Sequence, residues 1–431
     1  MIFRNSLRLC AALAAALIFS IFAGAGQAGL DDKALEAKAR ELHARILTVD
    51  THCDTPSRMA GDSGGVLLRS GGAFDAGERH ESGKRESGLV DLPRMVDGGL
   101  DAIFFGVFVG QGELSPQGYA RAKERALQEL DAIHAMAEKY PGLVGLATTP
   151  ADARRLKKEG KRIAFIGMEN GYPIGRDPAL LSEYARRGIR YLTLCHSGDN
   201  DICDSSSDRR DPEDKGLSDF GRSVVAECNR LGIMVDVSHM SDKSFADVLR
   251  ASRAPVIASH SCCRNLCDNA RNLSDDMIRA LAKNGGVIQI CFLSAYLKAP
   301  RPNPERDKAL RELEEKYGSR RNAQAIQDEA ARSKVMQEYQ ALMQKYPQER
   351  AAVKDIVDHI DHVIKLVGAD YVGIGTDFDG GGGVTGCGDV SEMYHVTMEM
   401  LRRGYSQDVI EKVWGGNIMR VLQKVIDAAK V

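Results

Sequence analysis

Six residues of the kinds that bind metals or move protons follow short apolar runs in this chain. Each run is about five residues long and rich in Val and Ile, which is typical of a buried strand rather than of an amphipathic helix. The six are His52 and Asp54 after residues 46–49, Glu169 after 163–166, His196 after 191–194, His239 after 233–237, and His260 after 256–258. Histidines with carboxylates, and no grouped cysteines, are the ligand set of a hydrolytic zinc site, and a set of this size suggests two metals.

The spacing of these residues suits shared metal ions. Residues i and i+2 of a strand point the same way, so His52 and Asp54 can reach one metal together. His239 or His260 alone could be a core histidine, but both are expected on neighbouring strand ends with Glu169 nearby. The carboxylate of Glu169 has two oxygens that can bridge two ions. A water between such ions is deprotonated near neutral pH and attacks a carbonyl carbon.

Ligand-type residues at the carboxyl ends of successive strands predict an α/β fold of the (β/α)8 TIM-barrel type, with the metal site at those ends. We expect one barrel domain over residues 29–431, because no second domain signature and no internal repeat is present. Eight strands are expected. Four have the ranges 45–52, 102–109, 286–292 and 372–377, and the other four are the runs that end at Glu169, His196, His239 and His260. The expected helices are 31–44, 117–140, 180–187, 220–231, 242–252, 275–283, 353–367 and 406–424.

The first 28 residues have the pattern of a secretory signal peptide. Two arginines precede an apolar stretch from residue 9 to residue 23, and small residues offer cleavage points after Ala25 or Ala28. The stretch is short for a bilayer span, which disfavours the alternative of an uncleaved membrane anchor. The polar residues 427–431 carry no hydrophobic tail for a lipid anchor. We therefore expect an exported protein, periplasmic or secreted, with no membrane anchor after signal cleavage.

Charge and cysteine content exclude several classes of partner. The chain has 58 Lys and Arg against 60 Asp and Glu, a formal net charge of −2, so nothing favours nucleic acid or an anionic membrane. One of the ten cysteines lies in the expected signal peptide, and the remaining odd number leaves at least one unpaired unless a bridge between chains forms. Their spacing does not predict a zinc finger, a redox pair or any particular disulfide.

Residues 298–350 stand outside the alternation of strands and helices. They are dense in Lys, Arg, Glu, Gln and Ala and precede the last expected strand. We predict a solvated helical hairpin inserted in the seventh connection of the barrel. A lid or a dimer contact is the alternative, because connections at that end of a barrel surround the active site.

The motifs resemble those of the renal (membrane) dipeptidase family of zinc metallopeptidases, which have amidohydrolase-like barrels. The matching stretches occur in order along nearly the whole mature chain: residues 49–54, 167–171, 191–197, 235–239, 255–261, 270–275, 372–380 and 415–417. The resemblance implies a zinc-dependent dipeptidase whose substrates are dipeptides, including some with a D-residue at the C-terminal side. It also suggests a homodimer.

The resemblance implies two Zn²⁺ per chain. His52 and Asp54 would bind the first ion, and His239 and His260 would bind the second. Glu169 and a water or hydroxide would bridge the two ions.

The resemblance also implies three substrate-binding residues, two of which are catalytic. His196 would contact the scissile carbonyl oxygen, and Arg271 would bind the terminal carboxylate, as its guanidinium fork suits. Asp377, at the end of the last strand, would accept the proton of the nucleophile and return it to the leaving amine. The nearest rivals are Arg264 for the carboxylate and Asp379 for the proton.

The chain departs from the family pattern in three places. Residues 197–204 replace a shorter aromatic-bearing loop, the insertion at 298–350 is added, and Cys291 stands where the family has Asn. These departures leave the metal ligands untouched and bear on substrate preference.

Two other function classes remain open. One is a related hydrolase on the same barrel that acts on a cyclic amide, a lactone or an N-acyl amino acid. The other is an exported binding protein without activity, which the complete ligand set disfavours. Arg271 separates the first alternative from a dipeptidase, because a substrate without a free carboxylate gives that side chain nothing to bind.

Overall fold

The computed structural model describes residues 31–60, 88–208, 210, 213–318, 328–347 and 349–430. The expected signal peptide, residues 1–28, lies outside the described residues, so that assignment stays a prediction. Within the described part of the chain, no helix combines the length and the apolar character that a bilayer span requires.

The strands form one parallel sheet that curls into a nearly closed barrel. Among the described residues, eight strands neighbour each other in the order β1-β2-β4-β5-β6-β7-β8-β9, and β3 pairs with β4 outside this path. They are β1 (Val49–Cys53), β2 (Ala102–Phe108), β3 (Val144–Leu146), β4 (Arg162–Glu169), β5 (Ile189–Thr193), β6 (Met234–Asp236), β7 (Ile257–Ser261), β8 (Val287–Ile290) and β9 (Val372–Ile374). Beyond β9, the amide of Asp377 donates to the carbonyl of His52 at 3.0 Å, and the amide of Asp54 donates to that of Phe378 at 2.9 Å. The predicted α/β barrel is confirmed.

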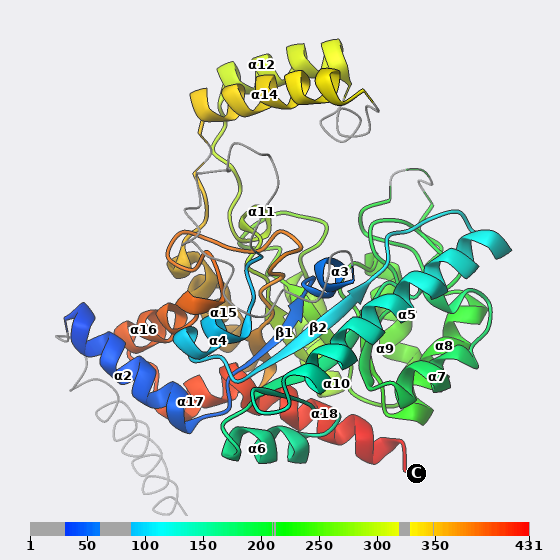
Figure 1. Ribbon diagram of the computed structural model, residues 1–431, viewed down its shortest axis with the longest axis vertical. Helices are drawn as coiled ribbons and strands as arrows, with labels where there is room; N and C mark the ends of the chain where they lie inside the picture. The colour runs from blue at the N-terminus through cyan, green and yellow to red at the C-terminus, as the bar shows by residue number, and fades with distance from the viewer. Residues whose placement is uncertain are drawn as a thin grey trace, which may run out of the picture.

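Helices alternate with the strands and cover the outside of the barrel (Figure 1). They are α2 (Asp32–Arg45), α3 (Pro56–Met59), α4 (Leu92–Gly98), α5 (Pro116–Lys139), α6 (Pro150–Lys158), α7 (Leu180–Arg186), α8 (Asp219–Leu231), α9 (Asp242–Ala251), α10 (Asp275–Asn284), α11 (Ser294–Leu297), α12 (Pro304–Tyr317), α14 (Glu329–Lys345), α15 (Val353–Val367), α16 (Tyr394–Arg402), α17 (Gln407–Glu411) and α18 (Asn417–Ala428). Side-chain caps fix several starts. The hydroxyl of Ser218 accepts from the amide of Gly221 at α8, and that of Ser274 accepts from the amide of Met277 at α10.

Strand β3 and helices α3, α4, α6, α11 and α16 were not predicted from the sequence, and residues 406–424 were expected to form one helix. In the structure a π-helical turn, Lys412–Gly416, separates α17 from α18. Gly415 explains the interruption, because a Cβ there would lie 2.2 Å from the carbonyl oxygen of Leu47. The helix therefore passes directly against the residues that lead into β1.

The inner core of the barrel is apolar and closed at one end. The rings of Phe104 and Phe165 stack with centroids 4.5 Å apart. Helix α18 adds apolar side chains to the same cluster: Ile418, Met419, Val421, Leu422 and Val425. Figure 1 shows α18 crossing beneath the barrel, at the end opposite to the strand arrowheads. This packing excludes water from the amino ends of the strands and leaves the carboxyl ends for a site.

Bulges interrupt the sheet where two site strands end. Asp50 pairs with Ile103 and Cys53 with Phe105, so β1 carries one extra residue relative to β2. The same excess occurs on β7 between Ala258 and Ser261. A bulge re-aims side chains locally, and His52 and His260 lie within these two irregular stretches.

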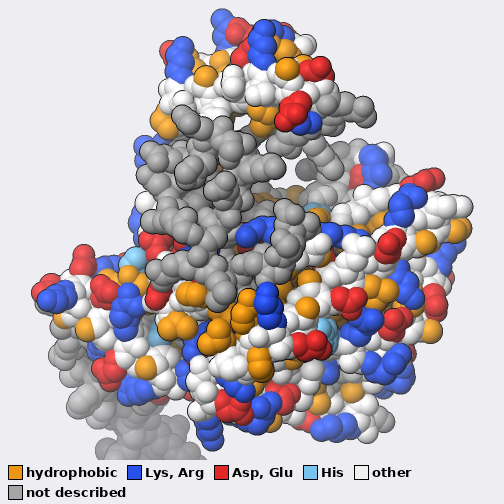
Figure 2. Space-filling view, in the orientation of Figure 1, with side chains coloured by type: hydrophobic (Ala, Val, Ile, Leu, Met, Phe, Trp, Pro, Cys, Tyr) orange, Lys and Arg blue, Asp and Glu red, His pale blue; other side chains and the backbone are white. Residues whose placement is uncertain are grey.

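In the described part of the charged insertion, helices α12 and α14 pack on each other. Val335 and Tyr339 of α14 are buried against Leu310, Leu313 and Tyr317 of α12. The pair stands away from the barrel, on the side toward which β1 and β2 point (Figure 1). Figure 2 shows acidic and basic side chains spread over it.

We expect the barrel to be stable without this hairpin, because the hairpin's buried contacts are internal. Replacing residues 304–346 by a short Gly-Ser linker should shift the midpoint of thermal unfolding by less than about 3 °C. Circular dichroism of the two proteins at equal metal content measures the shift. A much larger loss would mean that the hairpin supports the barrel, whereas unchanged stability with altered turnover would indicate a lid.

Candidate metal centre

Glu169 lies at the centre of a cluster of histidines. It ends β4 and is 1% exposed. Its Oε1 lies 3.0 Å from Nε2 of His239 and 3.2 Å from Nε2 of His260. Its Oε2 lies 3.5 Å from Nε2 of His52. Because the two oxygens face different histidines, this one carboxylate is placed to serve two ions.

Polar atoms without partners indicate what the cluster can hold. His52 Nε2, Asp54 Oδ1 and Glu169 Oε2 are all buried and have no hydrogen-bond partner among the described residues. His52 Nε2 lies 3.4 Å from Asp54 Oδ1. Buried polar atoms normally have partners, and these lone pairs converge as they would around a cation. The donor set of imidazole nitrogens and carboxylate oxygens therefore fits zinc.

The described residues contain three overlapping groups with ligand atoms within 4.8 Å of one another: His52, Glu169 and His260; Glu169, His196 and His239; and His52, Asp54 and Asp377. The structure thus brings together all five residues predicted to bind metal. It also places His196 and Asp377 within the same cluster, so proximity alone does not separate ligands from catalytic groups.

Neighbouring side chains orient two of the histidines. His52 Nδ1 lies 2.7 Å from the hydroxyl of Tyr191. His260 Nδ1 lies 2.8 Å from the hydroxyl of Ser259, which donates to Asp236 at 2.6 Å. When each ring N–H is donated at Nδ1, the lone pair at Nε2 is left for a metal. Sequence reasoning missed these partners, although a charged residue such as Asp236 inside an apolar strand was a usable signal.

Small residues make room for this arrangement. A Cβ at Gly167 would lie 2.0 Å from the ring of Tyr191, and a Cβ at Gly106 would lie 2.9 Å from the ring of His52. Glycine at these two strand positions therefore lets the aromatic rings fill the barrel beneath the site.

The environment keeps the second pair of histidines neutral. Burial, reinforced by the charge of Arg271, lowers the pKa of His239 well below its usual range. Burial and the charge of His52 lower the pKa of His260 to about 3. Neutral imidazole is the form that binds metal.

The carboxylates respond to crowded negative charge. Burial and the neighbouring Glu169 raise the pKa of Asp54 to about 6. Burial opposes ionisation of Glu169 too, but the charge of His52 and the hydrogen bonds from His239 and His260 hold its pKa well below its usual range. The site therefore contains a firmly ionised carboxylate beside a second carboxylate whose negative charge is disfavoured by burial, and a bound cation would relieve that penalty.

Unusual backbone conformations surround the centre. Four non-glycine residues of the described chain have positive φ: Asn170 (78°), His239 (73°), Asp377 (60°) and Asp379 (67°). All four follow the ends of strands. Left-handed backbone is costly for such residues and clusters at functional sites. It turns the chain out of the sheet, which is why β6 and β9 end before the predicted positions, His239 and Asp377.

His196 lies on the open side of the cluster. Its side chain is 23% exposed, and its Nε2 lies 3.9 Å from Glu169 Oε1. Its Nδ1 lies 2.8 Å from the hydroxyl of Ser197, and burial lowers its pKa. A neutral, partly exposed imidazole beside the centre can meet a substrate, and its contact with a carbonyl oxygen stays a prediction.

The two arginines proposed for carboxylate binding have different surroundings. Arg264 forms a two-pronged ion pair with Asp242, with both distances 2.7 Å. Arg271 is 5% exposed and donates from Nη2 to the carbonyl of His260 at 3.2 Å. Its Nε has no partner among the described residues. Arg271 is therefore the arginine with hydrogen-bonding capacity left for a ligand.

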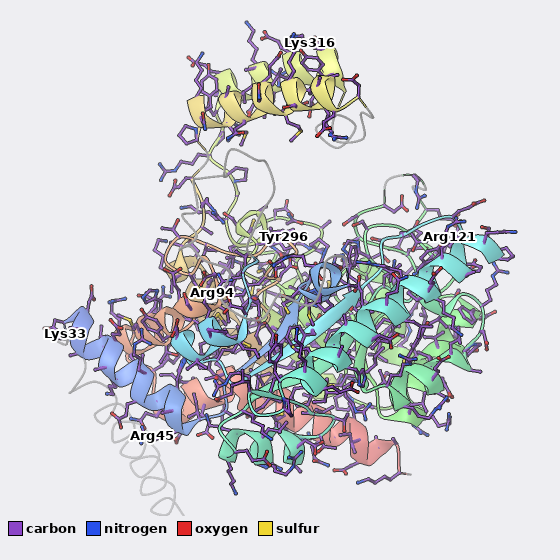
Figure 3. All side chains as sticks on the ribbon, viewed as in Figure 1. Lys33, Arg45, Arg94, Arg121, Tyr296 and Lys316 are labelled. Carbon is purple, nitrogen blue, oxygen red and sulfur yellow. The ribbon has the colours of Figure 1, made fainter. Side chains whose placement is uncertain are left out.

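Tyr296 of α11 joins Arg271 and was missed in the sequence. The guanidinium carbon of Arg271 lies 5.3 Å from the centre of the Tyr296 ring. Figure 3 shows Tyr296 above the carboxyl ends of the strands. Burial raises the pKa of Tyr296 to about 12, so its hydroxyl is a neutral donor. No sequence signal marked it, because α11 is a single short turn.

Asp377 and its rival Asp379 are also distinguished by their contacts. Asp377 Oδ1 lies 3.9 Å from Nε2 of His52, and burial and Asp54 raise the pKa of Asp377 well above its usual range. Asp379 accepts hydrogen bonds from Thr55, Arg58 and the amide of Leu89. Its carboxylate holds the loop after β1 and has less capacity left for the site.

Comparisons with known proteins agree with this geometry. Residues 36–431 match the family described as membrane dipeptidase (peptidase family M19). The dipeptidase tcpJ of Claviceps purpurea (strain 20.1) is 32% identical over 84% of this chain and 75% of its own length. The dipeptidase ataJ of Aspergillus terreus (strain NIH 2624 / FGSC A1156) is 29% identical over 91% of this chain and 88% of its own.

Solved structures share the barrel. The probable dipeptidase PvdM from Pseudomonas aeruginosa is 32% identical, with a TM-score of 0.76 over 92% of this chain and all of its own. A metallopeptidase from Rhodobacter sphaeroides, liganded with a phosphinate mimic of the dipeptide L-Ala-D-Ala, is 24% identical, with a TM-score of 0.67 over 88% of this chain and 99% of its own; this likeness shows the shared fold. The chain belongs to the membrane dipeptidase family, and it is a metal-dependent hydrolase of the dipeptidase kind.

Proposed function

We propose that this chain is an exported dizinc dipeptidase that hydrolyses the peptide bond of dipeptides. The observation that carries the proposal is the placement of Glu169, whose two oxygens face separate histidine groups. Near them lies Arg271, whose Nε has no partner among the described residues. Export is supported by the pattern of residues 1–28. The homodimer suggested by the resemblance stays a prediction.

The chain supplies ligands for two ions. His52 and Asp54 would hold the first zinc, His239 and His260 the second, and Glu169 would bridge them. Bound zinc would supply an acidified water and polarise the scissile carbonyl.

The remaining residues orient the dipeptide and move protons. Arg271 binds its terminal carboxylate, and Tyr296 donates from the same side. His196 contacts the carbonyl oxygen at the open edge of the cluster. Asp377 takes the proton of the attacking water and delivers it to the leaving amine, since amide cleavage needs that nitrogen protonated. The dipeptide mimic bound to the Rhodobacter sphaeroides metallopeptidase supports this class of substrate.

The substrate class is tested with free, C-terminally amidated and N-acylated L-L and L-D dipeptides. The parent enzyme should cleave free dipeptides and act poorly on amidated ones. Arg271→Met should lose on the order of 2–4 kcal/mol in kcat/KM, because the carboxylate loses a charged partner. Arg264→Met is the matched control and should lose far less. Equal rates on free and amidated dipeptides would instead favour a related hydrolase of cyclic amides, lactones or N-acyl amino acids.

Metal content tests the assignment of ligands. The parent protein should bind close to two zinc ions per chain. Glu169→Gln removes charge from the shared carboxylate, so both ions should bind poorly and activity should vanish. His196→Ala should retain both ions and lose turnover. Elemental analysis of the dialysed variants decides this, and the loss of one zinc from His196→Ala would make His196 a ligand.

The two aspartates in the loop after β9 are expected to respond differently to substitution. Asp377→Asn should keep zinc and the fold while kcat falls by about 10²–10⁴-fold, the usual contribution of a general acid–base group. Asp379→Asn should lose far less, because its carboxylate serves the loop after β1. Kinetics and metal analysis are run together on both variants. Zinc loss in Asp377→Asn would identify Asp377 as a sixth ligand. If Asp379→Asn is inactive but keeps its zinc, Asp379 and not Asp377 is the proton-transfer group.

A further inference from the structure

Cys291 is buried beside the carboxylate of Asp377. It follows β8 directly and is 0% exposed. Its Sγ lies 3.8 Å from Oδ2 of Asp377, within hydrogen-bond range for sulfur. The amide of Leu293 donates to the same sulfur at 3.4 Å, and the thiol of Cys262 donates to the carbonyl of Cys291 at 3.3 Å. Among the described residues, Oδ2 of Asp377 is the acceptor found for the S–H of Cys291.

The side chain of Asp377 has few other restraints. Its two oxygens face different neighbours, Oδ1 toward His52 at 3.9 Å and Oδ2 toward Cys291. The amides of Gly380, Gly381 and Gly382 donate to its backbone carbonyl, which fixes the main chain but leaves the carboxylate free to turn. In the described part of the chain, Cys291 is the hydrogen-bond donor found for that carboxylate.

We propose that Cys291 is a positioning residue for peptide hydrolysis: its S–H donates to Oδ2 of Asp377 and thereby turns Oδ1 toward the space beside His52 and Asp54. This inference rests on the proposed function, which assigns proton transfer to Asp377. A thiol is a weak donor. Its hydrogen bond to Oδ2 orients the carboxylate of Asp377, and Oδ1 stays available for the proton. Cys291 does not itself meet the substrate.

The proposal predicts an effect on kcat rather than on KM, because Arg271 and His196 bind the dipeptide. Removing one modest hydrogen bond costs up to about 1.5 kcal/mol, so kcat of Cys291→Ala should fall by roughly tenfold. Zinc content and KM should stay near parent values. Cys291→Ser keeps a donor and should recover most of that loss. Equal losses in the Ala and Ser variants, or no loss in the Ala variant, would overturn the proposal.

Cys263→Ala is the matched control. Cys263 is also buried near the end of a neighbouring strand, but its thiol donates to the carbonyl of His359 and not to Asp377. Its loss should alter thermal stability to a similar degree and leave kcat unchanged. A tenfold fall in kcat for this control would show that removal of any buried thiol perturbs the site, which contradicts a specific role for Cys291.

A double-mutant cycle tests whether Cys291 acts through Asp377. Once Asp377→Asn has removed the proton-transfer group, adding Cys291→Ala should cost nothing further in kcat. If the two losses instead multiply, Cys291 acts on something else. If Cys291→Ala fails to fold, the nearly isosteric pair Cys291→Thr and Cys291→Val replaces it. The Thr variant should exceed the Val variant in kcat by about tenfold, since only Thr can donate, and equal values would overturn the proposal.

An infrared measurement on the zinc-loaded enzyme needs no turnover. The difference in S–H stretching absorption between the parent and Cys291→Ala isolates the Cys291 thiol. In the parent this band should lie at the low frequency of a thiol that donates to a carboxylate, and it should rise in Asp377→Asn. A band that does not respond to Asp377→Asn would overturn the contact. A responsive band in a protein that cleaves no dipeptide would leave the contact standing and refute the proposed function instead.

Discussion

The buried carboxylate of Glu169 is the feature on which the rest of the site depends. An ionised group without water is costly unless partners surround it. Here the partners come from β1, the loop after β6, and β7, through His52, His239 and His260. In this chain the partners lie on three different strands or the loops after them, and the barrel brings those strand ends to one face. Two zinc ions would complete its neutralisation.

The barrel wall beneath the site is held by two further buried carboxylates. Asp50 accepts hydrogen bonds from the amide and the hydroxyl of Thr376, which ties β1 to the loop after β9. Asp236 accepts from the hydroxyls of Thr193 and Ser259 and so joins β5, β6 and β7. Below them, α18 and the stacked rings keep water out. The ligands are therefore mounted at the ends of these strands or directly after them, on the part of the barrel that its core holds rigid.

The residues proposed to bind substrate lie in the connecting loops of the barrel. Arg271 and Tyr296 lie together there, and an acidic hollow of about 550 Å³ is lined by residues that follow β5, β6 and β7, among them Asp199, Asp242 and Asp268. The helical hairpin projects on the same side (Figure 1). These segments include the insertion and the loop after His196 that set this chain apart in sequence. Variation in a barrel enzyme concentrates in such loops because they are not needed for closure of the sheet.

The sequence alone determined the parallel barrel, because short apolar runs that end in ligand-type residues are visible locally. It also indicated which residues share the site, since all strands of such a barrel end on one face. Only the tertiary structure showed that Asp379 and Arg264 are occupied by Arg58 and Asp242, and that Cys291 meets Asp377. The sequence also did not predict the bulges or the left-handed turns at His239 and Asp377. Nor did it predict which oxygen of Glu169 faces which histidine. They depend on contacts between strands far apart in the chain, and no local spacing encodes which side-chain atom faces which neighbour.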